Sequence, residues 1–234
     1  MIYYTKPSKP KRNFVLGLDV DETLLNPLEK YKEIINTKLG VNISVKDIEI
    51  SGGLDNFFRA SPIYDEFCKL ADSLRASSEF NSGLPTIEGS VECLSKILEL
   101  PNIVHVFYLT TRPHSVLLAT EENLRAVGFP QAEIITRPPN ILRENTAIWK
   151  QSVLSNLSDS SDSEIVFIDD NISTARFVCE KNKKLFKKIH MILYAGLISY
   201  TQIRAENVIS DYQNGLYLAD NWNQISDICY QIMI

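Results

Sequence analysis

The sequence predicts an α/β fold in which helices sandwich a parallel β-sheet and a helical segment is inserted after the first strand. Three observations lead to this prediction. Short apolar runs rich in Val, Ile, Phe and Tyr recur along the 234-residue chain, each run is continuous rather than alternating, and helix-like stretches separate the runs. Continuous apolar runs are typical of strands buried on both faces, and strands that alternate with helices form parallel β-α-β units.

The expected elements follow one another in a regular order. Strands are expected at FVLGLD (14–19), IVHVFYLT (103–110), AEIIT (132–136), EIVFIDD (164–170) and HMILYAG (190–196). Helices are expected at SVECLSKILEL (90–100), SVLLATEENLRAVGF (115–129), NTAIWKQSVLSNL (145–157) and ISTARFVCEKNKKLFKK (172–188). The polar stretch SNLSDSSDSE (155–164) is expected to be a surface loop. Residues 1–25 and 84–234 would together form the core domain.

Residues 26–83 break this order, because they contain no strand-like run. They include two helix-like stretches, PLEKYKEIINTKLG (27–40) and PIYDEFCKLADSLRASS (62–78), and the apolar residues of the second fall on one helical stripe. Ligands of open α/β sheets bind at the carboxyl ends of the strands, which is where this segment leaves the core. We therefore interpret 26–83 as a helical cap beside the site. The alternative is that the segment only adds packing to the core.

Composition and charge exclude several classes of protein. The apolar fraction of 44% and the charged fraction of 23% are ordinary for a globular protein. A net charge of −5 argues against a nucleic-acid polymer as partner, and no apolar run approaches the roughly 18 residues that cross a membrane. The four cysteines are scattered, with no CxxC pair and no leader pattern at the N-terminus. We expect a reduced, cytoplasmic protein, and its oligomeric state stays open.

Acidic side chains gather where two of the expected strands end. Asp19 and Asp21 follow the first strand, and residues i and i+2 of an extended segment share a face, so the two carboxylates repel each other. Asp169 and Asp170 close the strand at 164–170. Because the carboxyl ends of parallel strands meet at one edge, the four carboxylates are expected in one crevice. Such a crevice suits a hard divalent cation with oxygen ligands, usually Mg²⁺.

A hydroxyl and an ammonium group accompany these carboxylates along the chain. Thr110 ends the strand at 103–110 and is followed by Thr111 and Arg112, while Lys150 lies in the helix-like stretch at 145–157. Taken singly, a threonine after a strand is usually a helix cap and a helical lysine is usually a solvated surface residue. Placed beside the carboxylates and a cation, the same groups would suit a phosphoryl group.

The order DxDxT, a strand that ends in Thr, then Lys, then DD resembles that of the haloacid dehalogenase superfamily of phosphotransferases. The motifs extend from Asp19 to Asp170, and the stretches LPTIEGSVECLSKIL and RPHSVLLATEENLRAVGFP are similar to its nucleotidase-like and acid-phosphatase-like branches. The resemblance implies a Rossmann-like core, a C1-type helical cap at 26–83, and an Mg²⁺-dependent phosphatase. Its substrate would be a phosphate monoester of a small metabolite or nucleotide.

The resemblance also implies a catalytic role for each matching residue. Asp19 would be the nucleophile that forms an aspartyl-phosphate, and Asp21 the general acid and base. This division of labour requires a raised pKa for Asp21 and a low one for Asp19, the split expected when only one of the two carboxylates directly binds the metal. Lys150 would neutralise charge on the phosphoryl group and on Asp19. Thr110, Thr111, Arg112 and Lys150 are expected to bind the substrate. For Arg112, a surface ion pair is the alternative.

The same resemblance implies a set of metal ligands. Asp19 and Asp170 would bind Mg²⁺ directly, Asp21 would contribute its backbone carbonyl, and Asp169 would act through water or another ligand. The acidic side chain of Asp21 favours phosphate-ester chemistry, because a halide leaving group needs no acid. Thr or Ala at that position would instead fit an ATPase-like or phosphonatase-like branch.

Two other functions remain open at this point. A phosphomutase would use the same acids but retain the phosphoryl group, and a regulatory module could bind metal and phosphate without turnover. The lysine cluster between Lys181 and Lys188 has two interpretations as well: a solvated helix face, or a patch that attracts a polyanionic substrate.

Overall fold

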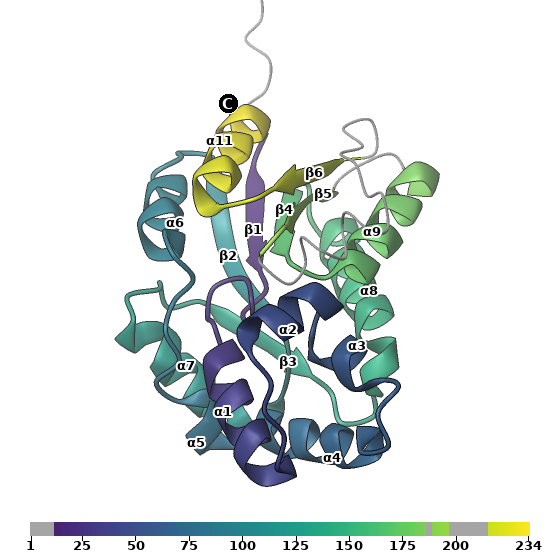
Figure 1. The fold of residues 1–234 in the computed structure, drawn as a ribbon. Helices are drawn as coiled ribbons and strands as arrows, with labels where there is room; N and C mark the ends of the chain where they lie inside the picture. Colours follow the sequence, from purple (N-terminus) through teal and green to yellow (C-terminus); the bar gives the residue numbers. More distant parts are fainter. Residues whose placement is uncertain (1–11, 186–188, 197–214) are drawn as a thin grey trace, which may run out of the picture.

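The computed structural model describes residues 12–185, 189–196 and 215–234, and in this part of the chain one sheet of six parallel strands lies at the centre (Figure 1). The strand order is β3-β2-β1-β4-β5-β6. The strands are β1 (Phe14–Leu18), β2 (Ile103–Pro113), β3 (Glu133–Arg137), β4 (Glu164–Asp169), β5 (Ile189–Tyr194) and β6 (Leu216–Ala219). The predicted α/β fold with a helix-covered parallel sheet is confirmed.

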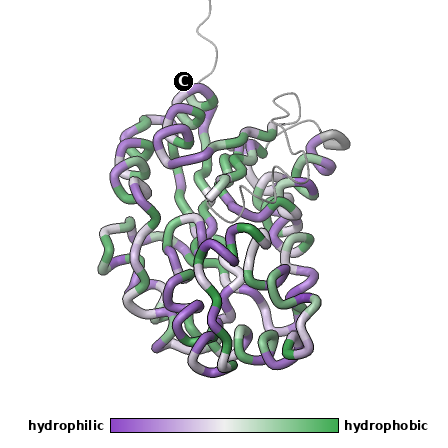
Figure 2. The backbone as a smooth tube through the Cα atoms, viewed as in Figure 1, coloured by the Kyte–Doolittle hydropathy of each residue, from purple (hydrophilic) through white to green (hydrophobic). Residues whose placement is uncertain are grey.

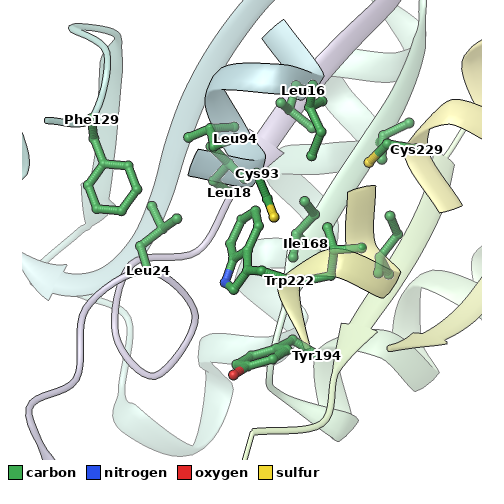
Figure 3. Close-up of a cluster of buried hydrophobic side chains, with 14 of the residues drawn as sticks. Leu16, Leu18, Leu24, Cys93, Leu94, Phe129, Ile168, Tyr194, Trp222 and Cys229 are labelled. Carbon is green, nitrogen blue, oxygen red and sulfur yellow. The ribbon is translucent and has the colours of Figure 1, made fainter. Parts of the chain in front are cut away.

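Helices cover both faces of the sheet. On one face lie α6 (Ser90–Leu98), α7 (Leu117–Ala126) and α11 (Trp222–Met233), and on the other α8 (Thr146–Asp159) and α9 (Ile172–Leu185). The side chains of strand β4 pack on both faces of the sheet: Val166 and Ile168 belong to one apolar cluster, and Ile165 and Phe167 belong to the other. This alternation explains the continuous apolar runs in the sequence. Figure 3 shows Trp222 of α11 at the centre of the first cluster.

Several elements differ from the prediction, among them helix α11, which was not expected. Strand β6 was not expected, since it has only four residues, LYLA, of which two are only partly buried. Helix α8 extends to Asp159, so the first part of the expected polar loop 155–164 is helical. Ser155 and Ser158 are buried on the inner side of this helix. Their polar side chains suggest a surface loop in the sequence, although they are small enough to pack in the core.

The segment after β1 forms five helices: α1 (Leu28–Leu39), α2 (Val45–Ser51), α3 (Leu54–Phe58), α4 (Tyr64–Arg75) and α5 (Ser78–Asn81). They share an apolar cluster of their own, in which Phe58 stacks on Phe67 with ring centroids 4.5 Å apart. Figure 1 shows α1 to α4 gathered beside the end of β1, and in Figure 2 hydrophilic and hydrophobic stretches alternate along them. Each helix therefore turns one apolar side inward.

The two connections between this helical segment and the sheet run side by side. The amide of Asn26 donates to the carbonyl of Pro85 at 2.8 Å, and that of Ile87 donates to the carbonyl of Leu24 at 2.8 Å. The ammonium of Lys30 in α1 binds three backbone carbonyls of the returning connection, those of residues 79, 80 and 82, at 2.8 to 2.9 Å. These contacts fix the helical segment at the carboxyl end of β1.

Three further sequence-based expectations can be compared with the described residues. All four cysteines are free. Among the described residues, none of the helices combines the length and apolar character that a membrane span needs. In the lysine cluster, the side chains after Asn182 lie outside the described residues, as does the N-terminal segment 1–11.

Gly17 in the central strand β1 leaves no room for a side chain. A Cβ atom there would lie 2.4 Å from Cζ of Phe107 and 2.8 Å from Cδ2 of Phe167, two fully buried rings. We expect Gly17→Ala to lower the free energy of unfolding by roughly 1–3 kcal/mol, because overpacking a core forces its side chains out of their rotamers. Urea unfolding of the variant, and of Gly17→Ala combined with Phe107→Leu, measures this. An unchanged unfolding midpoint in the single variant would contradict the packing described here.

Candidate active site

The register of the sheet places Asp19 level with the acidic pair Asp169 and Asp170. Leu18 at the end of β1 lies opposite Tyr108 of β2 on one side and Ile168 of β4 on the other. The amide of Asp19 donates to the carbonyl of Ile168 at 2.9 Å. Asp19 and Asp169 therefore leave neighbouring strands at the same edge, the position at which open α/β sheets bind ligands.

A tight turn follows Asp19 and directs the next residues. The amides of Leu24 and Leu25 both donate to the carbonyl of Val20, at 3.0 and 2.9 Å. Glu22 has a φ of 60°, the only non-glycine residue with positive φ in the described part of the chain. Backbone strain of this kind, about 1–3 kcal/mol, is found most often at functional sites. The turn is held from outside by Trp222, whose Nε1 donates to the carbonyl of Thr23 at 3.0 Å.

Lys150 of α8 joins the two strand ends. Its Nζ donates to Oδ1 of Asp19 at 2.7 Å and to Oδ2 of Asp169 at 2.8 Å, and all three side chains are buried. Burial alone would lower the pKa of Lys150, but the two carboxylates outweigh it and raise that pKa above its ordinary value. The lysine is thus a permanent cation inside the site rather than the solvated surface residue that the helical pattern alone suggests.

Asp19, Asp169 and Asp170 can present three oxygens to one ion. One carboxylate oxygen from each lies within 4.8 Å of the other two. Burial raises the pKa of Asp19 to about 7, with repulsion from Asp169 and Asp21 added and Lys150 opposing. Burial and the carboxylates of Glu22, Asp169 and Asp19 raise the pKa of Asp170 well above its usual range. Crowded, hard oxygen donors of this kind, two of them buried and that of Asp170 partly exposed, fit a divalent cation such as Mg²⁺, which would relieve their mutual repulsion.

The side chain of Asp21 points to Arg112 and is not one of these three. Nε and Nη2 of Arg112 donate to the two oxygens of Asp21 at 2.9 and 2.6 Å, and Nη1 donates to Thr120 at 3.1 Å. The Arg112 side chain is 1% exposed and that of Asp21 29% exposed, so the two form a two-pronged ion pair whose arginine is buried, not the surface ion pair that was the alternative. Binding of the substrate by Arg112 stays a prediction.

This ion pair affects the pKa of Asp21 in the protein without metal. Burial would raise the pKa of Asp21, but the Arg112 guanidinium lowers it below its ordinary value. Asp19 has the raised pKa instead. The metal-free protein therefore has the opposite order of pKa values, because Arg112 binds Asp21, a contact that the sequence order does not reveal. The expected order with a cation bound to Asp19 stays a prediction.

The remaining predicted residues lie on β2. Thr110 is fully buried, and its Oγ1 accepts a hydrogen bond from the amide of Arg112 at 3.2 Å. Thr111 contributes its carbonyl to Nε of Arg137 at 3.1 Å, and Arg137 also binds the carbonyl of Ile141. Arg137, the last residue of β3, therefore links β2 to the loop that follows β3. β2 places Thr110 and Arg112 at the acidic edge of the sheet, beyond the residues level with Leu18.

Three residues near the carboxylates had not been singled out from the sequence. Glu22 follows Asp21 in the turn, whereas Tyr31 and Arg75 belong to the inserted helices. Burial and the neighbouring Asp21 raise the pKa of Glu22 to about 7, against the opposing effect of Arg75. Burial raises the pKa of Tyr31 to about 12. Glu22 could have been found from the sequence, because it lies between two motif residues. The sequence contains no signal for Tyr31 and Arg75, because they come near the site only through folding.

The fold can now be compared with the folds of known proteins. No protein-family model matches the chain, and no curated protein matches its sequence. Among solved structures, a HAD-superfamily hydrolase from Ehrlichia chaffeensis is similar over 96% of this chain and 100% of its own, with 14% identity and a TM-score of 0.54. A phosphonoacetaldehyde hydrolase-like protein from Oleispira antarctica is similar over 100% and 96%, with 13% identity and a TM-score of 0.58.

A predicted phosphoglycolate phosphatase from Haemophilus somnus is also similar, over 94% of this chain and 99% of its own, with 14% identity and a TM-score of 0.53. The chain thus has the Rossmann-like α/β fold of haloacid dehalogenase-superfamily hydrolases, over nearly its whole length. At such low identity the likeness concerns the fold.

Proposed function

We propose that the protein is an Mg²⁺-dependent phosphatase that hydrolyses phosphate monoesters of small metabolites or nucleotides in the cytoplasm. One observation carries this proposal: a buried lysine bridges Asp19 and Asp169 beside Asp170, at the carboxyl edge of a parallel sheet. The fold of the similar hydrolases supports it, and two of them are described as a predicted phosphoglycolate phosphatase and as phosphonoacetaldehyde hydrolase-like. The carboxyl of Asp21 favours phosphate esters over the second of these chemistries.

In the proposed reaction Asp19 is the nucleophile. One of its carboxylate oxygens attacks phosphorus, a new O–P bond forms, and the bond to the leaving oxygen breaks. Lys150 stabilises the charge on Asp19 and on the phosphoryl oxygens, and the hydroxyl of Thr110 donates to one of those oxygens. Water then attacks the phosphorus of the aspartyl-phosphate, which releases phosphate and restores Asp19.

Asp21 would move the protons in both steps. Because Arg112 lowers the pKa of Asp21 in the metal-free protein, Asp21 must first take up a proton from water as the negatively charged substrate binds beside it. It then gives this proton to the leaving oxygen and later takes one from the attacking water. Because Arg112 binds both of its oxygens, the carboxyl group is held in one orientation next to Asp19. Asp19, Asp170 and the backbone carbonyl of Asp21 would hold Mg²⁺, with Asp169 nearby but already bonded to Lys150. The cation, when bound, neutralises the charge of the phosphoryl group.

A hydrolysis screen tests this function. We expect the purified protein to release inorganic phosphate from at least one member of a panel of nucleotides, sugar phosphates and short-chain phosphates when Mg²⁺ is present, and EDTA to stop the release. Phosphate measured against substrate consumed separates hydrolysis from a mutase reaction, in which the phosphoryl group is retained. Binding of Mg²⁺ and phosphate with no turnover across the panel would favour a regulatory module and contradict the proposal.

A further inference from the structure

A chain of hydrogen bonds leads from the carboxyl of Asp21, the proposed general acid, into the interior of the protein. Nε and Nη2 of Arg112 donate to the two oxygens of Asp21, and Nη1 of the same guanidinium donates to Oγ1 of Thr120 in α7 at 3.1 Å. Arg112 and Thr120 are both buried. The guanidinium is therefore fixed at three points, two on the carboxyl and one on the threonine.

The hydroxyl of Thr120 has only one orientation that satisfies its two partners. It donates to the carbonyl of Val116, one turn earlier in the chain, at 2.9 Å. A hydroxyl has one hydrogen and two lone pairs, a carbonyl only accepts, and a guanidinium only donates. The hydrogen must therefore point to Val116 and a lone pair to Arg112. A buried guanidinium depends on such a partner, because a buried donor without an acceptor is costly.

Helix α7, which carries Thr120, is anchored next to this contact. Asn123 is buried, lies three residues after Thr120 and so on the same side of the helix, and binds the backbone of Leu84 twice. Its Oδ1 accepts from the amide of Leu84 at 3.1 Å, and its Nδ2 donates to the carbonyl at 3.3 Å. Leu84 lies in the connection that returns from the inserted helices to the sheet. Thr120 thus holds Arg112 from a fixed support.

Asp21 is the accessible end of this chain of contacts. Its side chain is partly exposed, whereas that of Arg112 is buried, so a substrate can meet the carboxyl but not the groups behind it. A carboxylate has about four lone-pair sites, and the guanidinium uses two of them. The sites that remain are available for the proton that passes to the leaving oxygen, and their direction is set by the guanidinium.

We propose that Thr120 is a positioning residue for the reaction: by fixing the guanidinium of Arg112, it sets the direction in which Asp21 delivers its proton. This inference rests on the proposed phosphatase function and adds to it a residue that acts only through others. In that step the bond between phosphorus and the leaving oxygen breaks, and the proton of Asp21 moves to that oxygen. Without the hydroxyl, the guanidinium loses one of its three fixed points and the carboxyl can turn with it. A displacement of about 1 Å can slow a reaction roughly 100-fold.

Thr120→Val tests this role, because valine has nearly the shape of threonine but no hydroxyl. On the alkyl phosphate found in the screen, we expect kcat to fall by about 10–100-fold, with KM and the affinity for Mg²⁺ changed by less than about twofold. Thr120→Ser keeps the hydroxyl and should restore kcat to within about threefold of the wild type. With p-nitrophenyl phosphate, whose leaving oxygen departs as a stable anion and needs no proton, Thr120→Val should lower kcat by less than about threefold.

The ratio of these two falls in kcat does not depend on how much of the variant is folded, so partial unfolding cannot imitate the result. Thr37→Val is the matched control. The hydroxyl of Thr37 also donates to the carbonyl four residues earlier, that of Glu33, at 2.9 Å, but Thr37 is exposed in α1. It should leave the turnover of both esters unchanged.

Three results would overturn the inference and leave the phosphatase proposal intact: an unchanged kcat in Thr120→Val, an equal fall on both esters, or no recovery in Thr120→Ser. If the wild-type protein hydrolyses alkyl esters alone, the fall in kcat and its recovery in Thr120→Ser decide. No turnover of any ester by the wild-type protein would overturn the phosphatase proposal, and this inference with it.

Discussion

Asp19→Asn is expected to abolish Mg²⁺-dependent phosphate release, with kcat lowered by roughly 10⁴–10⁶-fold, the range found when a nucleophile that forms a covalent intermediate is removed. The amide has the shape of the carboxyl group but cannot attack phosphorus, and it removes one negative charge from the set that would bind the cation. Phosphate release at saturating substrate, measured on the substrate identified in the screen, gives the effect.

The same substitution should leave folding intact. Burial, with repulsion from Asp169 and Asp21 added, raises the pKa of Asp19 to about 7. An asparagine in its place can still accept the hydrogen bond from Lys150. We expect a melting temperature equal to or above that of the wild type. Asp162→Asn, an exposed aspartate in the loop before β4, is the control and should change neither activity nor stability. Residual kcat above about one tenth of the wild-type value would exclude Asp19 as the nucleophile.

Lys150→Met is expected to have the largest effect on stability. The substitution keeps the apolar stem of the side chain but leaves the Asp19 and Asp169 carboxylates without their shared cation, and the Lys150 side chain is only 3% exposed. Removing one partner of a buried ion pair costs about 3–5 kcal/mol, because the remaining charge stays buried and uncompensated. Urea unfolding in the absence of metal measures the loss, and phosphate release should disappear as well.

We expect this loss of stability only when the lysine that is replaced is buried. Lys96→Met is the matched control, since Lys96 is an exposed lysine of α6 and exposed substitutions usually change stability by no more than about 0.5 kcal/mol. If Lys150→Met unfolds at the same urea concentration as the wild type, the buried bridge between β1 and β4 does not exist as described.

The sequence predicted the elements of the fold best where successive residues of a strand are all buried. Each long apolar run became a strand, because strands covered on both faces need apolar residues at every position. β6 escaped prediction because two of its four residues are only partly buried. The end of α8 was not predicted because its buried side chains there are those of the serines Ser155 and Ser158. In both cases a tertiary contact decided the structure, and the local pattern did not record it.

The site, too, could be predicted from the sequence only in part. The carboxylates and Lys150 could be placed near one another from topology alone, since parallel strands end at one edge. The partner of Asp21 could not, because Arg112 lies in the last part of β2, where the register with β3 shifts, and reaches Asp21 by a particular side-chain orientation. Arg75 and Tyr31 approach from an insertion whose packing against the core no sequence spacing reveals.

Mg²⁺ binding to the purified protein tests most directly whether β1 and β4 supply one cation site. We predict that titration calorimetry of the metal-free wild-type protein with Mg²⁺ gives a single site, and that Asp170→Asn weakens binding by at least roughly tenfold while Asp162→Asn does not. Equal affinity in wild type and Asp170→Asn, or no binding to either, would contradict a cation shared by Asp19 and Asp170.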